Sequence, residues 1–183
     1  MKRLAIALAV TAAFALTVHK APAYATQSYE ARVTASAASR AALDDMMTVF
    51  GTDHLAPGKY RWRDNAEDFS GDQRVVISLE NQLAFLYMGN DLVAAASISS
   101  GRDGRESPAG VFQILNKTPM YHSKKYDNAP MPFAQFFTDY GIALHAGANP
   151  GYPASHGCIR LPSGFAKKLY TTTDVGTTVL IGA

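Results

Sequence analysis

Three apolar runs in the middle of the chain constrain its fold more than any other feature. Arg74 to Leu79, Leu83 to Met88 and Leu92 to Ser97 each have the length and composition of a β-strand. The connections Glu80-Asn81-Gln82 and Gly89-Asn90-Asp91 are short and rich in turn residues, so the runs are expected to form an antiparallel meander. Leu83 to Met88 is apolar on both faces, which is typical of a strand covered on both sides. The runs therefore predict a mainly β fold built around a sandwich.

Further short elements are expected around the meander. Gly110 to Leu115 and Thr178 to Ile181 are strand-like, and Ser163 to Tyr170 is predicted to be a short helix after Pro162. Lys117 to Tyr140 is rich in aromatic residues but has no clear period. A long segment of this kind is often functional. It is interpreted either as an aromatic flap over a site or as a satellite core under a surface loop.

The first 25 residues have the pattern of a secretory signal peptide. Lys2 and Arg3 precede an apolar run from Leu4 to Val18, and Ala23-Tyr24-Ala25 is an A-x-A cleavage site. The apolar run is shorter than the ~20 residues that a transmembrane helix needs, and an uncleaved anchor is the alternative. We expect an exported protein, periplasmic or associated with the cell wall. It would begin at Thr26 and have no stable membrane insertion after cleavage of the signal.

Residues 26–72 are expected to form an N-terminal linker and helical extension. Thr26 to Ala38 is rich in Ala, Ser and Thr and has no apolar period, which indicates a linker or a frayed helix. A helix is expected from Ser39, as its cap, to Gly51, with one apolar face formed by Leu43, Met46, Met47 and Phe50. Because this pattern is ordinarily amphipathic, we expect the helix to pack on the domain that follows rather than on a partner. That domain is expected to span residues 73–183.

Charge and cysteine content narrow the class of protein. Cleavage after Ala25 removes three basic residues, which changes the formal net charge from +2 to −1. A chain of this charge gives no reason to expect nucleic acid as a partner. The single cysteine excludes an internal disulfide, and an unpaired thiol in an exported protein suggests a reactive group.

The only cysteine lies in a stretch of unusual composition, His145 to Leu161. Glycines and prolines are frequent between its two histidines, so a shaped loop is expected there. Ile142 to His145 before the loop and Cys158 to Leu161 after it are predicted to be short strands. Loops held between strands often display reactive groups.

A thiol near a histidine can carry out acyl transfer, with the thiolate as nucleophile and the imidazole as proton acceptor and donor. In extended backbone His156, Cys158 and Arg160 would share a face, and Arg160 could bind a substrate carboxylate through two hydrogen bonds. Gly157 leaves room for a backbone N–H beside Cys158 to face an oxyanion. His145 could reach the sulfur from the neighbouring strand. The residues alone leave open which histidine is the base.

The same cysteine and histidines allow more than one interpretation. A charged imidazole beside the sulfur is expected to lower the thiol pKa. A lone cysteine is, on the other hand, commonly a small buried hydrophobe. His145, His156 and Cys158 could instead bind zinc, although no H-E-x-x-H or paired C-x-x-C motif accompanies them.

The segment Ser155-His156-Gly157-Cys158-Ile159-Arg160-Leu161, with Ile142-Ala143-Leu144-His145 upstream, resembles the signature of the YkuD-type L,D-transpeptidase catalytic domain. Upstream segments fit the strands and loops of the same family, namely Val75 to Ser78, Gln82 to Tyr87, Ser107 to Phe112 and Ala129 to Pro132. The chain departs from the family where His145 is followed by Ala146, because many members have glycine there. In the family the carbonyl after the histidine can orient the ring, and alanine preserves that carbonyl.

The resemblance implies a mixed-sheet β-sandwich with a few short helices. It implies Cys158 as nucleophile, His145 as base, and substrate-binding roles for Ser155, His156, Gly157 and Arg160. The implied activity is that of a peptidoglycan L,D-transpeptidase, which crosslinks stem peptides through a cysteine thioester and needs neither metal nor organic cofactor. With water or a protein lysine as acceptor, the same fold would be an L,D-carboxypeptidase or an anchoring enzyme. A zinc peptidase and a non-catalytic wall-binding module are the remaining alternatives.

Overall fold

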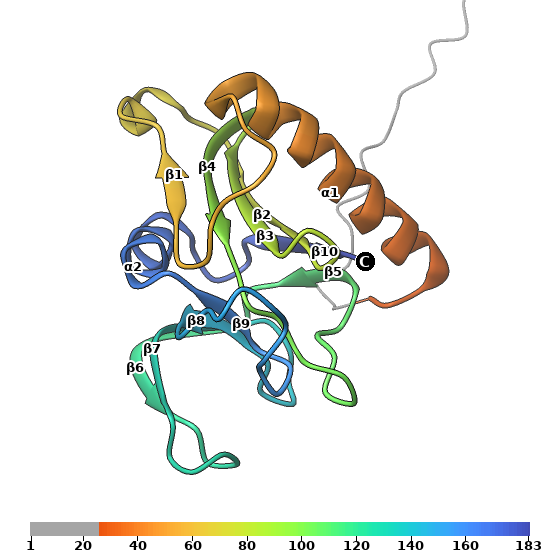
Figure 1. Ribbon diagram of the computed structural model, residues 1–183, viewed down its shortest axis with the longest axis vertical. Helices are drawn as coiled ribbons and strands as arrows, with labels where there is room; N and C mark the ends of the chain where they lie inside the picture. Colours follow the sequence, from red (N-terminus) through yellow and green to blue (C-terminus); the bar gives the residue numbers. More distant parts are fainter. Residues whose placement is uncertain (1–25) are drawn as a thin grey trace, which may run out of the picture.

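Two β-sheets form the frame of the structure, a computed structural model that describes residues 26–183 (Figure 1). The first sheet has the strand order β1-β4-β3-β2-β10-β5 and the second has the order β6-β7-β8-β9. The strands are β1 (Tyr60–Trp62), β2 (Gln73–Ser78), β3 (Leu83–Met88), β4 (Asp91–Ser97), β5 (Gly110–Gln113), β6 (Asn116–His122), β7 (Pro130–Phe136), β8 (Ala143–Ala146), β9 (Ile159–Leu161) and β10 (Thr178–Gly182). The predicted signal peptide, residues 1–25, lies outside the described residues.

The first sheet contains the predicted meander. β2 pairs antiparallel with β3, and β3 pairs antiparallel with β4, with Val76 opposite Phe85 and Phe85 opposite Ala95. The last strand, β10, joins parallel to β2, with Ile181 opposite Ile77, and this makes the sheet mixed. The predicted mainly β fold with mixed sheets and few helices is therefore confirmed.

The second sheet includes the segment for which no regular structure was predicted. Lys117 to Tyr140 contains most of β6 and all of β7, which pair antiparallel with Tyr121 opposite Met131. The expectation of a long structureless segment was wrong. Prolines at 119, 130 and 132 interrupt the alternation that marks a strand, and Phe133 has a φ of 57°. β6 is an edge strand, where a proline lacking its N–H can be accommodated.

The main core lies between the two sheets. Side chains of β2, such as Val75 and Ile77, meet Leu144 of β8 and Ile159 of β9 in one buried cluster. The helix α2 (Ser163–Thr172) closes this cluster, with Phe165 fully buried. Its position agrees with the short helix predicted after Pro162. One face of β8 and β9 is thus packed against the core, and the loop between the two strands extends from it.

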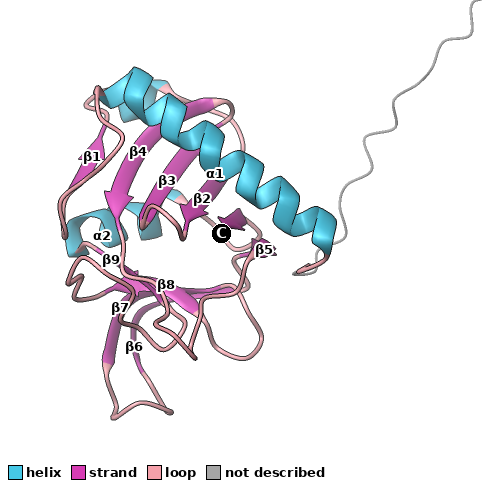
Figure 2. Cartoon of the chain, turned by 45° about the vertical axis from the view of Figure 1, so that its right-hand side comes forward, coloured by secondary structure: helices cyan, strands magenta, loops and turns pink. Residues whose placement is uncertain are grey.

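The helix α1 (Tyr29–Phe50) covers the other face of the first sheet (Figure 2). Its cap is Ser28, eleven residues before the predicted cap at Ser39, because the Ser28 hydroxyl accepts a hydrogen bond from the Ala31 N–H. Ser39 is instead buried within the helix. The helix ends at Gly51, as predicted, with that residue in the left-handed conformation. A 3-10 turn, η1 (Ala66–Asp68), follows β1.

Small residues allow α1 to lie close to the sheet. The buried positions of the helix follow its period and are Ala31, Ala35, Ser39, Ala42 and Met46. A Cβ atom on Gly182 of β10 would lie only 2.5 Å from the Ser39 Oγ and 2.7 Å from the Ala35 carbonyl oxygen. The Tyr87 hydroxyl donates to the Asp45 carboxylate at 2.6 Å, which ties the helix to β3. Residues 29–50 thus pack on the sheet as one folded unit with it.

Replacement of Met46 by alanine is expected to lower the free energy of unfolding by about 2–5 kcal/mol, because it opens a cavity between α1 and the sheet. Met47→Ala is the matched control, since that side chain is 48% exposed and its loss should change stability by less than about 0.5 kcal/mol. Urea unfolding of both variants measures the difference. Equally small effects would show that α1 is not part of the cooperatively folded unit.

Candidate active site

The loop from Gly147 to Cys158 is hydrogen-bonded to the last residue of β4, Ser97, and to the residues that follow it. The Ser155 N–H donates to the Ser100 carbonyl at 2.9 Å, and the Ser99 hydroxyl donates to the Tyr152 carbonyl at 2.8 Å. The Asn149 side-chain amide donates to the Ser97 hydroxyl at 3.2 Å. These contacts hold the loop at several points along its length, so the cysteine at its end has a defined position.

Ser155 and Gly157 shape the turn that carries Cys158. The buried Ser155 hydroxyl donates to the Cys158 carbonyl at 2.5 Å and accepts from the Gly157 N–H at 3.0 Å. Gly157 has a φ of +115°, and a Cβ atom there would lie 2.7 Å from the Ile142 Cδ1. No other residue type fits this position without displacing Ile142. Both hydrogen bonds of the Ser155 hydroxyl lie within the loop, so Ser155 shapes the turn that carries Cys158. The substrate contact expected for it stays a prediction.

The sequence predicted a common face for His156, Cys158 and Arg160, with His145 approaching the sulfur from the neighbouring strand. β8 and β9 are parallel neighbours, with Leu144 opposite Ile159 and His145 opposite Arg160. Paired residues of adjacent strands place their side chains on the same face. Cys158 lies just before β9, which spans Ile159–Leu161. Burial nevertheless alternates from Ser155 onward, and Cys158 is partly exposed, as Arg160 is. The cysteine, the histidine and the arginine therefore lie on one face of this sheet.

The Cys158 side chain lies against an apolar wall formed by Met131, Ala134 and Ala143. Burial raises the thiol pKa, against smaller opposing effects of the Ala143 backbone and the Arg160 charge. The resting group is therefore a thiol, which needs a base before it can attack. Among the loop and turn hydrogen bonds of residues 26–183, none uses the Cys158 N–H as donor. That N–H remains available to a developing oxyanion.

His145 is buried and has a fixed ring. Its Nδ1 lies 2.8 Å from the Ala146 carbonyl oxygen, and because a carbonyl only accepts, Nδ1 carries the proton and Nε2 is the basic nitrogen. Alanine after the histidine thus supplies the orienting carbonyl, as the resemblance implied. Burial lowers the pKa of His145 to about 4, with the Arg160 charge acting in the same direction. The imidazole is therefore neutral at pH 7.

These directions contradict one expectation from the sequence. A charged imidazole was expected to lower the thiol pKa, but His145 is neutral in the resting state and the Cys158 pKa is raised. The main cause in both groups is burial, which disfavours the charged form; the Arg160 charge lowers the His145 pKa further and only partly offsets the rise at Cys158. Among the hydrogen bonds of residues 26–183, none joins the two side chains. The resting pair therefore consists of a neutral thiol and a neutral imidazole.

Burial of neutral His145 makes stability depend on pH. Its ordinary pKa of 6.5 falls to about 4 in the folded state, so the unfolded state binds the proton more tightly. The stabilisation is complete above pH 6.5 and is lost as the pH falls towards 4. His145→Asn should remove this loss, which is at most about 3 kcal/mol. Urea unfolding at pH 7 and pH 4.5 checks it; an equal loss in both proteins would contradict the assignment.

His156 lies on the outside of the turn, where its ring stacks on Tyr126. The two ring centroids are 4.1 Å apart and the planes differ by 14°. Burial lowers the His156 pKa, and the charges of Arg102, Arg105 and Arg160 lower it further. Tyr126 belongs to the β6–β7 connection, so the aromatic segment does reach the site loop, as the flap interpretation proposed. Its partner in the stack could not be identified from the sequence, because thirty residues separate them.

Arg160 has no acidic partner among the described residues. The ion pairs of residues 26–183 do not include it, and its backbone pairs with Ser99 through two hydrogen bonds of 3.0 Å. The aliphatic part of its side chain lies against Gly147, where a Cβ atom would come within 3.0 Å of the Arg160 Cγ. An unpaired guanidinium beside the thiol can accept a carboxylate in two-pronged geometry.

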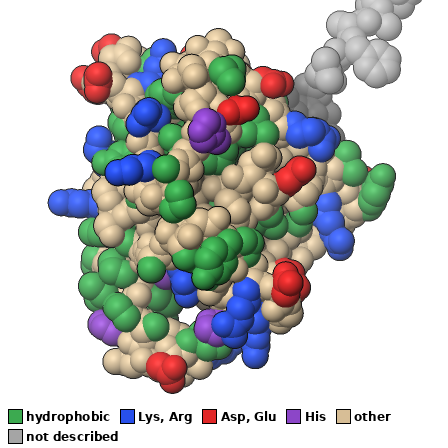
Figure 3. Space-filling model, in the orientation of Figure 1, with side chains coloured by type: hydrophobic (Ala, Val, Ile, Leu, Met, Phe, Trp, Pro, Cys, Tyr) green, Lys and Arg blue, Asp and Glu red, His purple; other side chains and the backbone are tan. Residues whose placement is uncertain are grey.

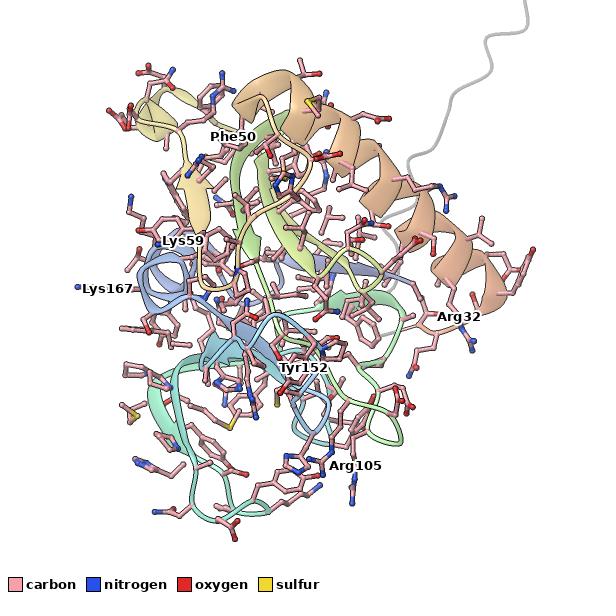
Figure 4. The ribbon with its side chains drawn as sticks, viewed as in Figure 1. Arg32, Phe50, Lys59, Arg105, Tyr152 and Lys167 are labelled. Atoms are coloured by element: carbon pink, nitrogen blue, oxygen red, sulfur yellow. The ribbon has the colours of Figure 1, made fainter. Side chains whose placement is uncertain are left out.

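The cavities of the structure and its acidic, histidine and cysteine side chains can be compared with the site around Cys158. A hollow of about 430 Å³ lies at the C-terminal end of α1, near Phe50 and Lys59, and contains none of the predicted site residues (Figure 4). A smaller one, of about 110 Å³, is lined in part by Asn149 and Gly151 of the site loop. Within residues 26–183 no three His, Cys, Asp or Glu side chains are grouped as metal ligands would be. The helices of this part of the chain include none with the length and apolar character of a membrane span.

Comparison with known families identifies the class of protein. Residues 72–181 match the model of the L,D-transpeptidase catalytic domain, YkuD. The chain therefore belongs to the L,D-transpeptidase catalytic domain family, and the resemblance seen in the sequence is confirmed. A search of curated proteins found no match.

Solved structures of L,D-transpeptidases have the same fold. One from Stackebrandtia nassauensis is 25% identical, with a TM-score of 0.57 over 67% of this chain and 58% of that one. One from Xylanimonas cellulosilytica is 27% identical, with a TM-score of 0.56 over 61% of each chain. One from Mycobacterium smegmatis is 20% identical, with a TM-score of 0.57 over 61% of this chain and 59% of that one. The likeness spans less than two thirds of each of these proteins.

Proposed function

We propose that this protein is an exported L,D-transpeptidase that crosslinks peptidoglycan stem peptides through a thioester on Cys158. Membership of the L,D-transpeptidase family supports the reaction class. The observation that carries the proposal is the shared face of β8 and β9, on which the only cysteine, a neutral histidine and an unpaired arginine lie together. The signal-peptide pattern of residues 1–25 supports export to the periplasm or cell wall.

The first half-reaction forms the acyl-enzyme. Nε2 of His145 takes the Cys158 proton while the sulfur attacks the carbonyl of the L-centre residue that precedes a terminal D-residue. The Cys158 N–H stabilises the oxyanion that forms on that carbonyl oxygen. The peptide C–N bond then breaks, His145 returns the proton to the leaving amine, and the D-residue departs. Arg160 holds a carboxylate of the donor in place during these steps.

The second half-reaction decides the product. An acceptor amine attacks the thioester carbonyl, loses a proton to His145, and releases the Cys158 thiol as the new amide forms. An amine from a second stem gives a crosslink. Water in the same position gives an L,D-carboxypeptidase, and a protein lysine gives an anchoring enzyme.

Mass spectrometry of purified disaccharide tetrapeptides after incubation with the protein tests the proposal. Crosslinked dimers together with the free D-residue are the expected products. Shortened monomers without dimers would replace transpeptidation with hydrolysis as the activity. Activity lost with EDTA and restored with zinc would support the metallopeptidase alternative, and unchanged substrate with no acyl adduct would support a non-catalytic module.

A further inference from the structure

The loop from Gly101 to Ser107 is fastened directly to the turn that carries Cys158. The Arg102 N–H donates to the Ser155 carbonyl at 3.1 Å, and the Ser107 hydroxyl donates to the Gly157 carbonyl at 2.7 Å. The loop itself is tight, since a Cβ atom on Gly101 would lie 2.0 Å from the Arg105 carbonyl oxygen. The backbone of this loop is therefore fixed relative to the turn that carries Cys158.

Two exposed arginines of this loop lie beside the His156–Tyr126 stack. Arg105 Nη1 donates to the Tyr126 hydroxyl at 3.4 Å, so its guanidinium is held on the outer side of the stack. The Arg102 backbone is bonded to Ser155, the residue before His156, and Arg160 follows four residues after that histidine. The charges of all three arginines lower the His156 pKa. Figure 4 shows Arg105 near the lower end of the molecule, on the side of the β6–β7 hairpin.

The three arginines have little compensation from acidic groups. None of them is in an ion pair among residues 26–183. The Glu106 carboxylate accepts a hydrogen bond from the Gly104 N–H at 2.7 Å, and Asp127 is the one acidic group that favours the protonated His156 ring. In the space-filling view a group of basic side chains lies next to a histidine on the lower part of the face shown (Figure 3). Like charges gathered without partners repel one another, and a bound anion would relieve that repulsion.

We propose that Arg102 and Arg105 form a subsite for an internal carboxylate of the donor stem peptide, next to the carboxylate position at Arg160. The inference rests on the proposed function and adds a specificity to it. Guanidinium groups bind carboxylates through paired hydrogen bonds that an amide cannot reproduce. The enzyme is therefore selective for stems with free internal carboxylates over stems in which these are amidated.

The test compares two synthetic tetrapeptide stems that differ only in amidation of their internal carboxylates. The wild-type protein should turn over the free-acid stem with a kcat/KM about tenfold higher, mainly through KM. The double variant Arg102→Gln, Arg105→Gln should reduce this ratio towards one through a lower kcat/KM for the free-acid stem. Arg40→Gln, an exposed change on α1, is the matched control and should keep the wild-type ratio. Melting curves check that all variants are folded.

A binding measurement keeps the inference separate from the proposed function. With Cys158→Ala protein, titration calorimetry of the same two stems reports the preference without any turnover. Tighter binding of the free-acid stem, lost in the added double substitution, supports the subsite even if no product forms. Equal binding of both stems, or a preference that survives loss of both arginines, would overturn it. Absence of turnover with a retained binding preference would count against the proposed reaction alone.

Discussion

Cys158→Ala is expected to reduce formation of crosslinked dimers and release of the D-residue to the background of a reaction without protein. The reason is that the proposed mechanism passes every acyl group through this sulfur, and the chain has no second cysteine that could replace it. The measurement is the rate of D-residue release from a tetrapeptide stem. The fold should be kept, because alanine fits the apolar wall that surrounds the thiol.

Cys158→Ser separates the chemistry of the sulfur from its shape. Serine keeps a polar hydrogen at the same place but ionises far less readily than a thiol, so turnover should also fall to background. Residual turnover in Cys158→Ala protein with a normal melting temperature would show that another group carries out the reaction. In that case the cysteine would be the buried hydrophobe that its apolar neighbours also allow.

His145→Ala is expected to lower kcat/KM by about 10²- to 10⁴-fold, the usual contribution of a general base. The loss should be large because the resting thiol has a raised pKa and cannot ionise near pH 7 without a proton acceptor. Stem-peptide turnover at pH 7 measures it. Alkylation of the variant at strongly alkaline pH should remain fast, since the thiolate then forms without a base, and this would show that Cys158 is intact.

The matched variant is His156→Ala. His156 lies outside the turn against Tyr126, so its loss should weaken substrate handling and leave the base in place. A 10²- to 10⁴-fold loss of turnover in His156→Ala, with His145→Ala near wild type, would reverse the two assignments. The same result would show that the hydrogen bond between the His145 ring and the Ala146 carbonyl does not orient the catalytic base.

The sheets could be predicted where side-chain alternation and turns agree. Residues 73–97 meet both conditions, and the three strands and their pairing follow from them. The start of α1 could not be found in this way, because its buried face is formed by alanine and serine rather than by large apolar residues. The regular spacing of these small residues marks the buried face of α1 only once the close contact of Gly182 with Ala35 and Ser39 is known. Prolines in β6 and β7 concealed the hairpin in a similar manner.

The site could be predicted as a set of residues but not as a geometry. The motif around Cys158 singled out the thiol, His145 and Arg160 as candidates, and the pairing of β8 with β9 places His145 opposite Arg160. The place of Ser155 within the loop depends on its hydrogen bonds to backbone atoms, which no pattern of residue types reveals. Arg102, Arg105 and Tyr126 lie far from Cys158 in sequence, so their position around His156 depends on the fold as a whole.

The most direct test of the account is the intact mass of the protein after brief incubation with a tetrapeptide stem in the absence of acceptor. The account predicts a species heavier than the protein by the stem without its terminal D-residue, sensitive to hydroxylamine and mapped by peptide digestion to Cys158. No such species should form with Cys158→Ala. An adduct on another residue, or turnover with no adduct at any time, would contradict the thioester mechanism.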